Sequence, residues 1–157
     1  MTLHFQHLII VAAKDIDELG HVNNVVYVRY VQEVAAAHWM NKASKEMQER
    51  YAWVVLRHEI DYRNPAFLDE EIIGETWVGE YNGARFDRFV KLRSKKTNKI
   101  LVEAKTTWCM LDGKSMRPTR ITQEVISIIS WSTERNGCWL LVSKCELPSC
   151  KLKIVIK

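Results

Sequence analysis

Two aspartates, a glycine, a histidine and two asparagines crowd into the ten residues Asp15–Asn24, directly before a helical pattern. In such a cluster Asp17 could act as a nucleophile, or as the base that activates a water molecule. His21 follows four residues later and could hold a carbonyl group or that water. Exposed backbone N–H groups at a helix start bind anions and can stabilise an oxyanion. These groups together would form a compact site for acyl transfer.

The same residues also have a purely structural interpretation. Asn23 or Asn24 can cap the helix, because an asparagine side chain accepts hydrogen bonds from the first free N–H groups. Gly20 suits a tight turn. Asp15 and Asp17 would then be loop carboxylates attracted by the positive end of the helix. The spacing alone leaves both interpretations open.

The elements that must position this cluster are a strand before it and a helix after it. The segment Leu3–Val11 has the composition of a strand, with Leu3, Phe5, His7 and Ile9 on one face. Helical spacing of apolar residues, followed by three alanines, predicts a helix over Val26–Met40. The apolar stripe of this helix consists of Tyr27, Tyr30, Val31 and Val34.

A short helical turn at Ser44–Tyr51 precedes a region in which the apolar period becomes two. The first strand of this region would place Val54, Leu56, His58, Ile60 and Tyr62 on one face. Three further strands are expected at Glu70–Tyr81, Ala84–Ser94 and Lys99–Leu111, joined by the hairpin sequences NG and KKTN. One strand, one long helix and a meander of four strands predict an α+β fold, with one face of the sheet free to cover the helix.

Composition excludes several classes of protein. A chain of 157 residues with 47% hydrophobic residues favours one globular domain. The net charge of +4 suits an anionic ligand or an acidic carrier protein, but no Lys/Arg run exceeds KK, so nucleic acid is not expected. No apolar stretch approaches the roughly 18 residues of a membrane span, and no leader pattern precedes the domain. We therefore expect a cytoplasmic protein.

The cysteines indicate neither a metal site nor a nucleophile. Cys109, Cys138, Cys145 and Cys150 have no zinc spacing, and Cys109 is expected to be a small core residue. Three of the four fall in the last segment, Trp131–Lys157, whose pattern is weak. We place a domain at residues 1–130 and treat 131–157 as a C-terminal extension of unclear role, which should pack on the domain or on a neighbouring subunit.

Three segments carry a resemblance to a known family. DIDELGHVNNVVYVRYVQE resembles the signature D-x-D-x-x-G-H-V-N-N-x-x-Y of the hotdog-fold thioesterases, the relatives of 4-hydroxybenzoyl-CoA thioesterase and of the acyl-carrier-protein thioesterases. HEIDYRNPAFLDEEI and TTWCMLDGKSMRPTRI are similar to later parts of that family, so the resemblance covers Leu3–Ile121. It implies a five-stranded antiparallel sheet wrapped around one long central helix.

The resemblance also implies roles for individual residues. Asp17 matches the catalytic carboxylate, His21 the histidine of the carrier-protein branch, and the Asn24 amide the oxyanion donor. Leu19 stands where that branch has an asparagine, which leaves the aspartate-centred mechanism intact. No cofactor or metal is implied. Substrate contacts are expected from Asn23, Tyr27 and His58.

The resemblance therefore predicts hydrolysis of an acyl thioester, releasing a carboxylic acid and the thiol of coenzyme A or acyl carrier protein, as in fatty acid metabolism. A homodimer or homotetramer joined edge to edge is expected, with sites at the interface. One alternative is a non-catalytic protein that binds acyl-CoA or acyl-ACP. A second is a hotdog hydratase or dehydratase, whose pattern has Asp five residues before His, whereas Asp17 and His21 are four apart.

Overall fold

The computed structural model describes residues 4–130 and contains five strands and three α-helices in that range. A strand, a short 3-10 turn and the long helix come first: β1 (Phe5–Ile10), η1 (Ala13–Asp15) and α1 (Asn24–Lys42). They are followed by α2 (Lys45–Arg50), β2 (Tyr51–Tyr62), β3 (Glu71–Asn82), β4 (Arg85–Ser94), β5 (Ile100–Asp112) and α3 (Gln123–Ser130). The predicted strands and the two predicted helices are confirmed, whereas α3 was not predicted.

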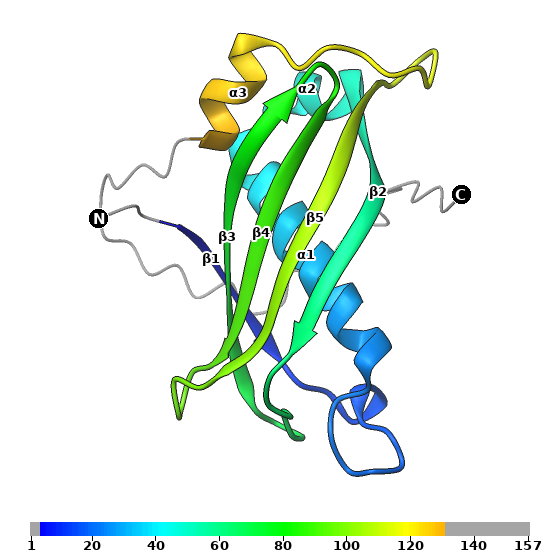
Figure 1. The fold of residues 1–157 in the computed structure, drawn as a ribbon. Coiled ribbons are helices and arrows are strands. Elements are labelled where there is room, and N and C mark those ends of the chain that lie inside the picture. Colours follow the sequence, from blue (N-terminus) through cyan, green and yellow to red (C-terminus); the bar gives the residue numbers. More distant parts are fainter. Residues whose placement is uncertain (1–3, 131–157) are drawn as a thin grey trace.

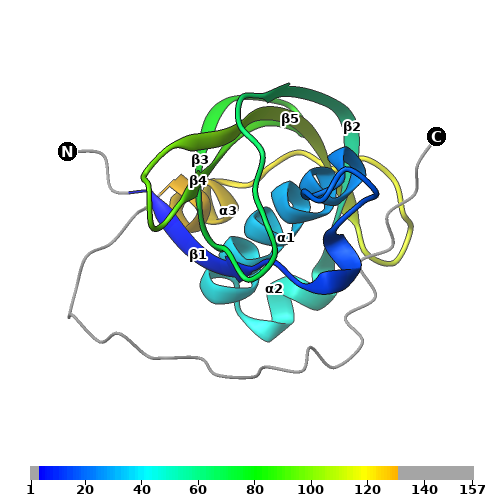
Figure 2. The same ribbon diagram turned by 90° about the horizontal axis from the view of Figure 1, so that it is seen from below.

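The five strands form one antiparallel sheet with the order β1-β3-β4-β5-β2. The sheet curves around α1, which crosses its concave face (Figures 1 and 2). The predicted α+β architecture is confirmed, but the predicted four-strand meander is wrong for β2. This strand pairs with β5 instead of its neighbour in sequence, β3, so only β3, β4 and β5 form a meander. The order leaves β1 and β2 at the two edges.

A β-bulge in β2 changes which of its side chains face the helix. The register against β5 shifts between Val55 and Arg57, which makes Leu56 the extra residue, and its side chain is 48% exposed. Trp53 and Val55 therefore pack on the core before the bulge. The prediction that Val54 and Leu56 share a face with His58 is wrong, because strict alternation does not continue through a bulge.

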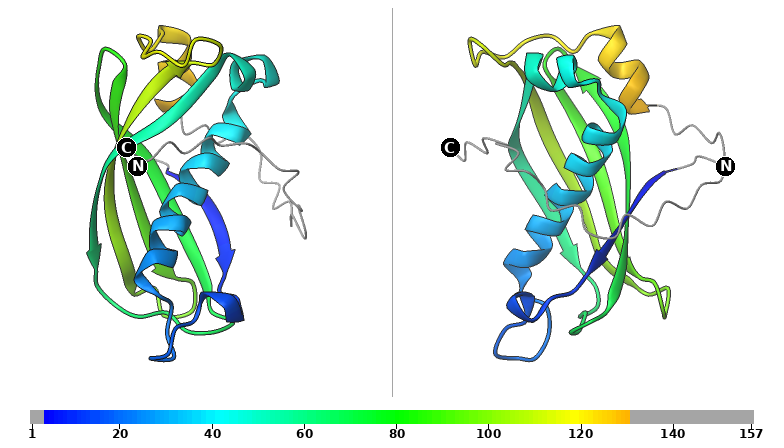
Figure 3. Two further views of the ribbon diagram at one scale, coloured as in Figure 1. Left: turned by 90° about the vertical axis from the view of Figure 1, so that its right-hand side faces the viewer. Right: turned by 180° about the vertical axis from the view of Figure 1, so that it is seen from behind.

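The core lies between α1 and the concave face of the sheet and has two parts. Valine and tyrosine residues of the first half of α1 pack on β3, β4 and β5, and the predicted stripe of Tyr27, Tyr30, Val31 and Val34 is buried there. Aromatic and long side chains fill the second part, around the C-terminal half of α1 and α3. Figure 3 shows α1 running across the sheet, with α3 beside its far end.

Gly74 of β3 allows α1 to approach the sheet closely. A Cβ added at Gly74 would lie 2.3 Å from Cγ2 of Val34, a β-branched side chain with little rotamer freedom in a helix. We expect Gly74→Ala to destabilise the protein by about 1–3 kcal/mol, the usual cost of overpacking. Gly79→Ala is the matched control, because its Cβ would meet the ring edge of Phe89, which is only partly buried and can turn aside. Thermal unfolding of both variants measures the difference, and equal midpoints would contradict this account.

Helix ends and hairpins follow the local sequence. Asn23 caps α1, and Ser44 caps α2 by accepting from the amide of Met47. Gly83 takes a positive φ of 62° in the β3–β4 hairpin, as expected from its NG sequence. The extension 131–157 lies outside the described residues, and so do its predicted packing and three of the four cysteines.

Candidate active site

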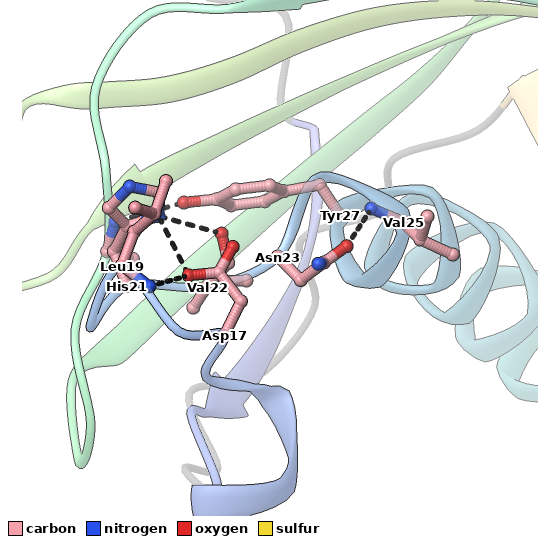
Figure 4. A network of polar contacts seen from close by, with 8 residues as sticks. Asp17, Leu19, His21, Val22, Asn23, Val25 and Tyr27 are labelled. Carbon is pink, nitrogen blue, oxygen red and sulfur yellow. Dashed lines mark hydrogen bonds and ion pairs between the residues drawn. The ribbon is translucent and has the colours of Figure 1, made fainter.

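The polar cluster folds into a tight loop between η1 and α1 (Figure 4). The amide of Asp17 donates to the carbonyl of His21 at 3.0 Å, and the amide of Gly20 donates to the carbonyl of Asp17 at 3.0 Å. Gly20 has a φ of 80°, the left-handed conformation that glycine adopts without strain. The loop therefore turns back on itself and holds the side chains of Asp17 and His21 close together.

The buried side chain of Asp15 anchors this loop to α1. Its carboxylate is 2% exposed and accepts from the Tyr30 hydroxyl at 2.7 Å, from the Ala12 amide at 3.2 Å and from the guanidinium of Arg29. Burial by itself would raise the pKa of Asp15, but the hydrogen bonds from Tyr30, Arg29 and Ala12 lower it overall, so the group is ionised at neutral pH. The sequence pattern predicted only a loop carboxylate at Asp15 and did not indicate this anchoring role.

Asp17, by contrast, keeps its carboxylate accessible. Its side chain is 23% exposed, Oδ1 accepts from the Leu19 amide at 2.9 Å, and the same oxygen lies 3.9 Å from Nδ1 of His21. The imidazole Nδ1 is also 3.3 Å from the carbonyl of Val22. A carboxylate held by one backbone amide retains free lone pairs, so it can attack a carbonyl carbon or take a proton from water.

The start of α1 adds a donor to this arrangement. The Asn23 side chain accepts from the Val25 amide at 2.9 Å, and the Asn23 carbonyl accepts from the Val26 amide at 2.9 Å. The amide of Asn24 donates to no acceptor within residues 4–130. Asn23 is therefore the cap, and Asn24 presents a free N–H at the positive end of the helix.

Tyr27 ties the helix start to the turn between β2 and β3. Its hydroxyl accepts from the Ala66 amide at 2.9 Å, while the Ala66 carbonyl accepts from the Val22 amide at 2.9 Å. The ring is buried, and burial raises the pKa of Tyr27. Tyr62 at the end of β2 donates to the carbonyl of Asn24 at 3.2 Å. The loop, the helix and the turn thus form one hydrogen-bonded unit.

His58 does not join this unit. It contacts Nε2 of Gln32 at 3.2 Å and Oγ1 of Thr106 at 2.8 Å. Gln32 lies eight residues beyond Asn24, which is about 12 Å along the helix. Burial lowers the pKa of His58, so its ring is neutral at pH 7. The structure therefore brings together Asp17, His21, Asn23, Asn24 and Tyr27, and places His58 apart from them, in contact with Gln32 of α1 and Thr106 of β5.

Large apolar side chains remain exposed around the loop. Leu19 and Val25 flank the start of α1, Phe67 and Leu68 follow Ala66 in the turn, and all four are exposed. An exposed apolar cluster of this kind beside the Asp17 carboxylate suits an apolar ligand or a protein partner.

Cys109 is buried in β5, and burial raises the pKa of its thiol, as expected for a core cysteine. Within residues 4–130, no group of three or more His, Cys, Asp or Glu side chains has the arrangement of a metal site. None of the helices in this range is long and apolar enough to cross a membrane.

Comparison with known proteins identifies the family. A model of the thioesterase-like superfamily matches residues 11–129. An uncharacterized protein of Mycobacterium tuberculosis is 28% identical over 125 residues, which cover 80% of this chain and 48% of that protein. The chain thus spans about half the length of the curated relatives it matches.

Solved structures agree on the fold. The probable thioesterase YbaW from Escherichia coli aligns with a TM-score of 0.71 and 22% identity, over 81% of this chain and 100% of that chain. Slr0204, a 1,4-dihydroxy-2-naphthoyl-CoA thioesterase from Synechocystis, aligns with a TM-score of 0.70 and 15% identity, over 80% of this chain and 95% of that chain. The chain has the hotdog fold and belongs to the thioesterase-like superfamily.

Proposed function

We propose that the protein hydrolyses an acyl thioester, releasing a carboxylic acid and a thiol, with Asp17 as the catalytic carboxylate. The observation that carries this proposal is the accessible Asp17 carboxylate in the loop that leads into α1. The first amide of this helix, that of Asn24, has no acceptor among residues 4–130. Membership of the thioesterase-like superfamily supports the same reaction class.

Each group has a distinct part in the proposed reaction. Asp17 attacks the thioester carbonyl, or takes the proton of the water that attacks it. The negative charge that develops on the carbonyl oxygen is stabilised by the Asn24 amide and the positive end of α1. His21 orients the carboxylate or the water, and the thiolate leaves as the tetrahedral intermediate collapses. When water attacks, this collapse gives the carboxylic acid directly. When Asp17 attacks, it gives an acyl anhydride on Asp17, which a water molecule then hydrolyses to the acid and the free carboxylate.

Coenzyme A is the thiol we favour. The Synechocystis neighbour is named as a thioesterase of a naphthoyl-CoA ester, and the chain here carries a net charge of +4 that suits a phosphate-bearing leaving group. An acyl carrier protein is acidic as well, and remains the alternative carrier. Exposed Leu19, Val25, Phe67 and Leu68 surround the loop and would contact the acyl group or a partner subunit.

We also propose that two copies join through β2. This edge strand has 12 residues against 6 in β1, and its Leu56 and Tyr62 side chains are exposed. A long unpaired edge with apolar side chains favours pairing with another strand. Equilibrium sedimentation is expected to show a dimer or a tetramer, and a monomer at micromolar concentration would contradict this.

The reaction is tested by release of free thiol from a panel of aromatic, short-chain and long-chain acyl thioesters, each on coenzyme A and on acyl carrier protein. We expect turnover with at least one acyl class and a preference for coenzyme A. Saturable binding without turnover of any thioester would favour the non-catalytic acyl-binding alternative. Hydration of an enoyl thioester in place of hydrolysis would favour the hydratase.

His21→Ala is expected to slow hydrolysis less than removal of the Asp17 carboxylate. The imidazole lies 3.9 Å from that carboxylate, and Leu19 occupies the position where an asparagine would complete an Asn-His relay. Loss of one positioning contact, if comparable to a hydrogen bond, is worth about 1 kcal/mol, which corresponds to a fall in kcat on the order of tenfold. If His21→Ala abolishes turnover while Asp17→Asn only weakens it, the two roles are reversed.

A further inference from the structure

The strand β1 leaves one edge of the sheet unpaired. It is the end strand in the order β1-β3-β4-β5-β2, and within the part of the chain that the structure describes no strand pairs with its other side. The amide of Val11 donates to the carbonyl of Glu70, on the β3 side. Backbone groups alternate in direction along an antiparallel edge strand, so those of Gln6, Leu8 and Ile10 point away from β3.

The side chains at this edge are apolar and exposed. Leu8 is 45% exposed and Ile10 is 61% exposed. Leu8 lies opposite Ile73 of β3, which is partly buried, so the three side chains form one apolar group on the outer face of the sheet. The sequence of β1, FQHLII, contains no lysine, proline or acidic residue of the kind that usually protects an edge from pairing. Such an edge favours the addition of another strand.

The described part of the chain ends on the same side of the molecule as β1. Helix α3 ends at Ser130 and packs on α1 and on β3, the strand next to β1 (Figures 2 and 3). Residues 131–150 can span about 66 Å when fully extended, at roughly 3.3 Å per residue. The strand β1 itself is only about 20 Å long. Residues 151–157 can therefore reach every position along this edge.

Residues 151–157 have the sequence KLKIVIK, which suits a strand at this place. Alternation of apolar and polar residues, with isoleucine and valine, is typical of a strand that has one apolar face. Leu152, Ile154 and Ile156 would share that face, whereas the other face would hold three lysines and one valine. Lysine is the residue that most often protects the edge of a sheet, and β1 has none.

The charges on the two faces of β1 agree with this orientation. The outer face beside Leu8 and Ile10 is apolar, as described above. On the opposite face, His7 of β1 contacts Glu33 of α1, with 3.1 Å between Nε2 and Oε1, and the Glu33 side chain is 39% exposed. Lysine side chains on the helix side of an added strand would therefore lie near a carboxylate.

We propose that residues 151–157 pair with the free edge of β1 in the same molecule and form a sixth strand of the sheet. Leu152, Ile154 and Ile156 would cover Leu8 and Ile10, and the lysines would face the side of Glu33. The added strand would satisfy the free backbone groups of β1, and its lysines would protect the new edge. This contact lies at the opposite edge from β2, so it does not depend on the proposed hydrolysis.

Amide hydrogen exchange of the full-length protein, resolved by NMR, tests the pairing. We expect the amides of Gln6, Leu8 and Ile10 to exchange at least about tenfold more slowly in the wild type than in Ile154→Pro, because a proline inside the added strand breaks its pairing. Ser143→Pro is the matched control, since it places a proline in the C-terminal extension but outside 151–157, and it should keep the protection. Amides of β4 should be unchanged in both variants.

A second pair of variants tests which face is buried. Ile154→Lys should lose the protection of the β1 amides, whereas Val155→Lys, on the lysine face, should keep it. Equal exchange in the wild type and in Ile154→Pro, or equal loss in the two lysine variants, would overturn the proposal. Protection that grows with protein concentration would also overturn it, because it would show that a second copy covers this edge.

Discussion

Asp17→Asn is expected to lower kcat for thioester hydrolysis by at least about a hundredfold, the usual minimum for loss of a catalytic base or nucleophile. The substitution keeps the shape of the side chain, and an asparagine oxygen can still accept from the Leu19 amide as Asp17 does at 2.9 Å. The loop should therefore stay folded while the group that attacks, or activates water, is lost. KM should change little, because the carboxylate acts on the reacting atoms more than on the thiol portion.

Glu18→Gln provides the matched control for that prediction. Glu18 is the next residue along the loop, is exposed, and loses the same charge on substitution. Its kcat should stay within a few-fold of the wild-type value. Thiol release under saturating substrate, with circular dichroism to verify folding, separates the two variants. Near-normal turnover in a folded Asp17→Asn protein would remove Asp17 from the mechanism.

The elements of this fold were predictable wherever the signal is local. The stripe of Tyr27, Tyr30, Val31 and Val34 repeats with the period of a helix, and the helix forms with this stripe buried. The NG hairpin forms because glycine tolerates the positive φ that such a turn needs. Periodicity over a few residues is enough to predict features of this kind.

Features that depend on distant parts of the chain were missed. The pairing of β2 with β5 depends on how the sheet closes around α1, and the bulge at Leu56 depends on the partner strand. Nothing local to β2 indicates either of them. The sequence pattern near Arg88 likewise shows only a charged residue in a strand, and its burial beside His38 appears only when β4 is placed against α1.

In the candidate site, too, residues close together in the sequence could be predicted, whereas a role that depends on distant partners could not. Asp17, His21 and Asn24 lie within eight residues, so a motif can identify them as a group. Asp15 was interpreted as an ordinary loop carboxylate, because its partners Arg29 and Tyr30 lie 14 and 15 residues further along the chain. Arg29 and Tyr30 lie in the second turn of α1, and the loop between Asp15 and Asn24 folds back so that Asp15 meets them. A sequence pattern of single residues that far apart is weak.

Asp15→Ala is expected to destabilise the protein by about 2–4 kcal/mol, because the buried hydroxyl of Tyr30 loses its acceptor. The substitution also removes the hydrogen-bond partner of Arg29 and of the Ala12 amide. Loosening of the loop should also lower kcat. An anchoring residue then differs from Asp17, because Asp17→Asn should lower kcat without changing stability. Denaturant unfolding at pH 7 measures the loss, and Arg29→Met, which removes a half-exposed partner, should cost less.

Two further measurements identify the cause of that loss. Tyr30→Phe should recover part of the stability when added to Asp15→Ala, because it removes the orphaned hydroxyl, although it is destabilising in the wild type. The pKa of Asp15 is lowered by folding from its usual 3.8, so its contribution is present above that value and is lost as the pH falls through the lower, folded-state pKa. The stability difference between wild type and Asp15→Ala should therefore be constant near neutral pH and shrink in acid. A difference that persists unchanged at pH values well below 3.8 would show that packing, and not the ionised carboxylate, holds the loop in place.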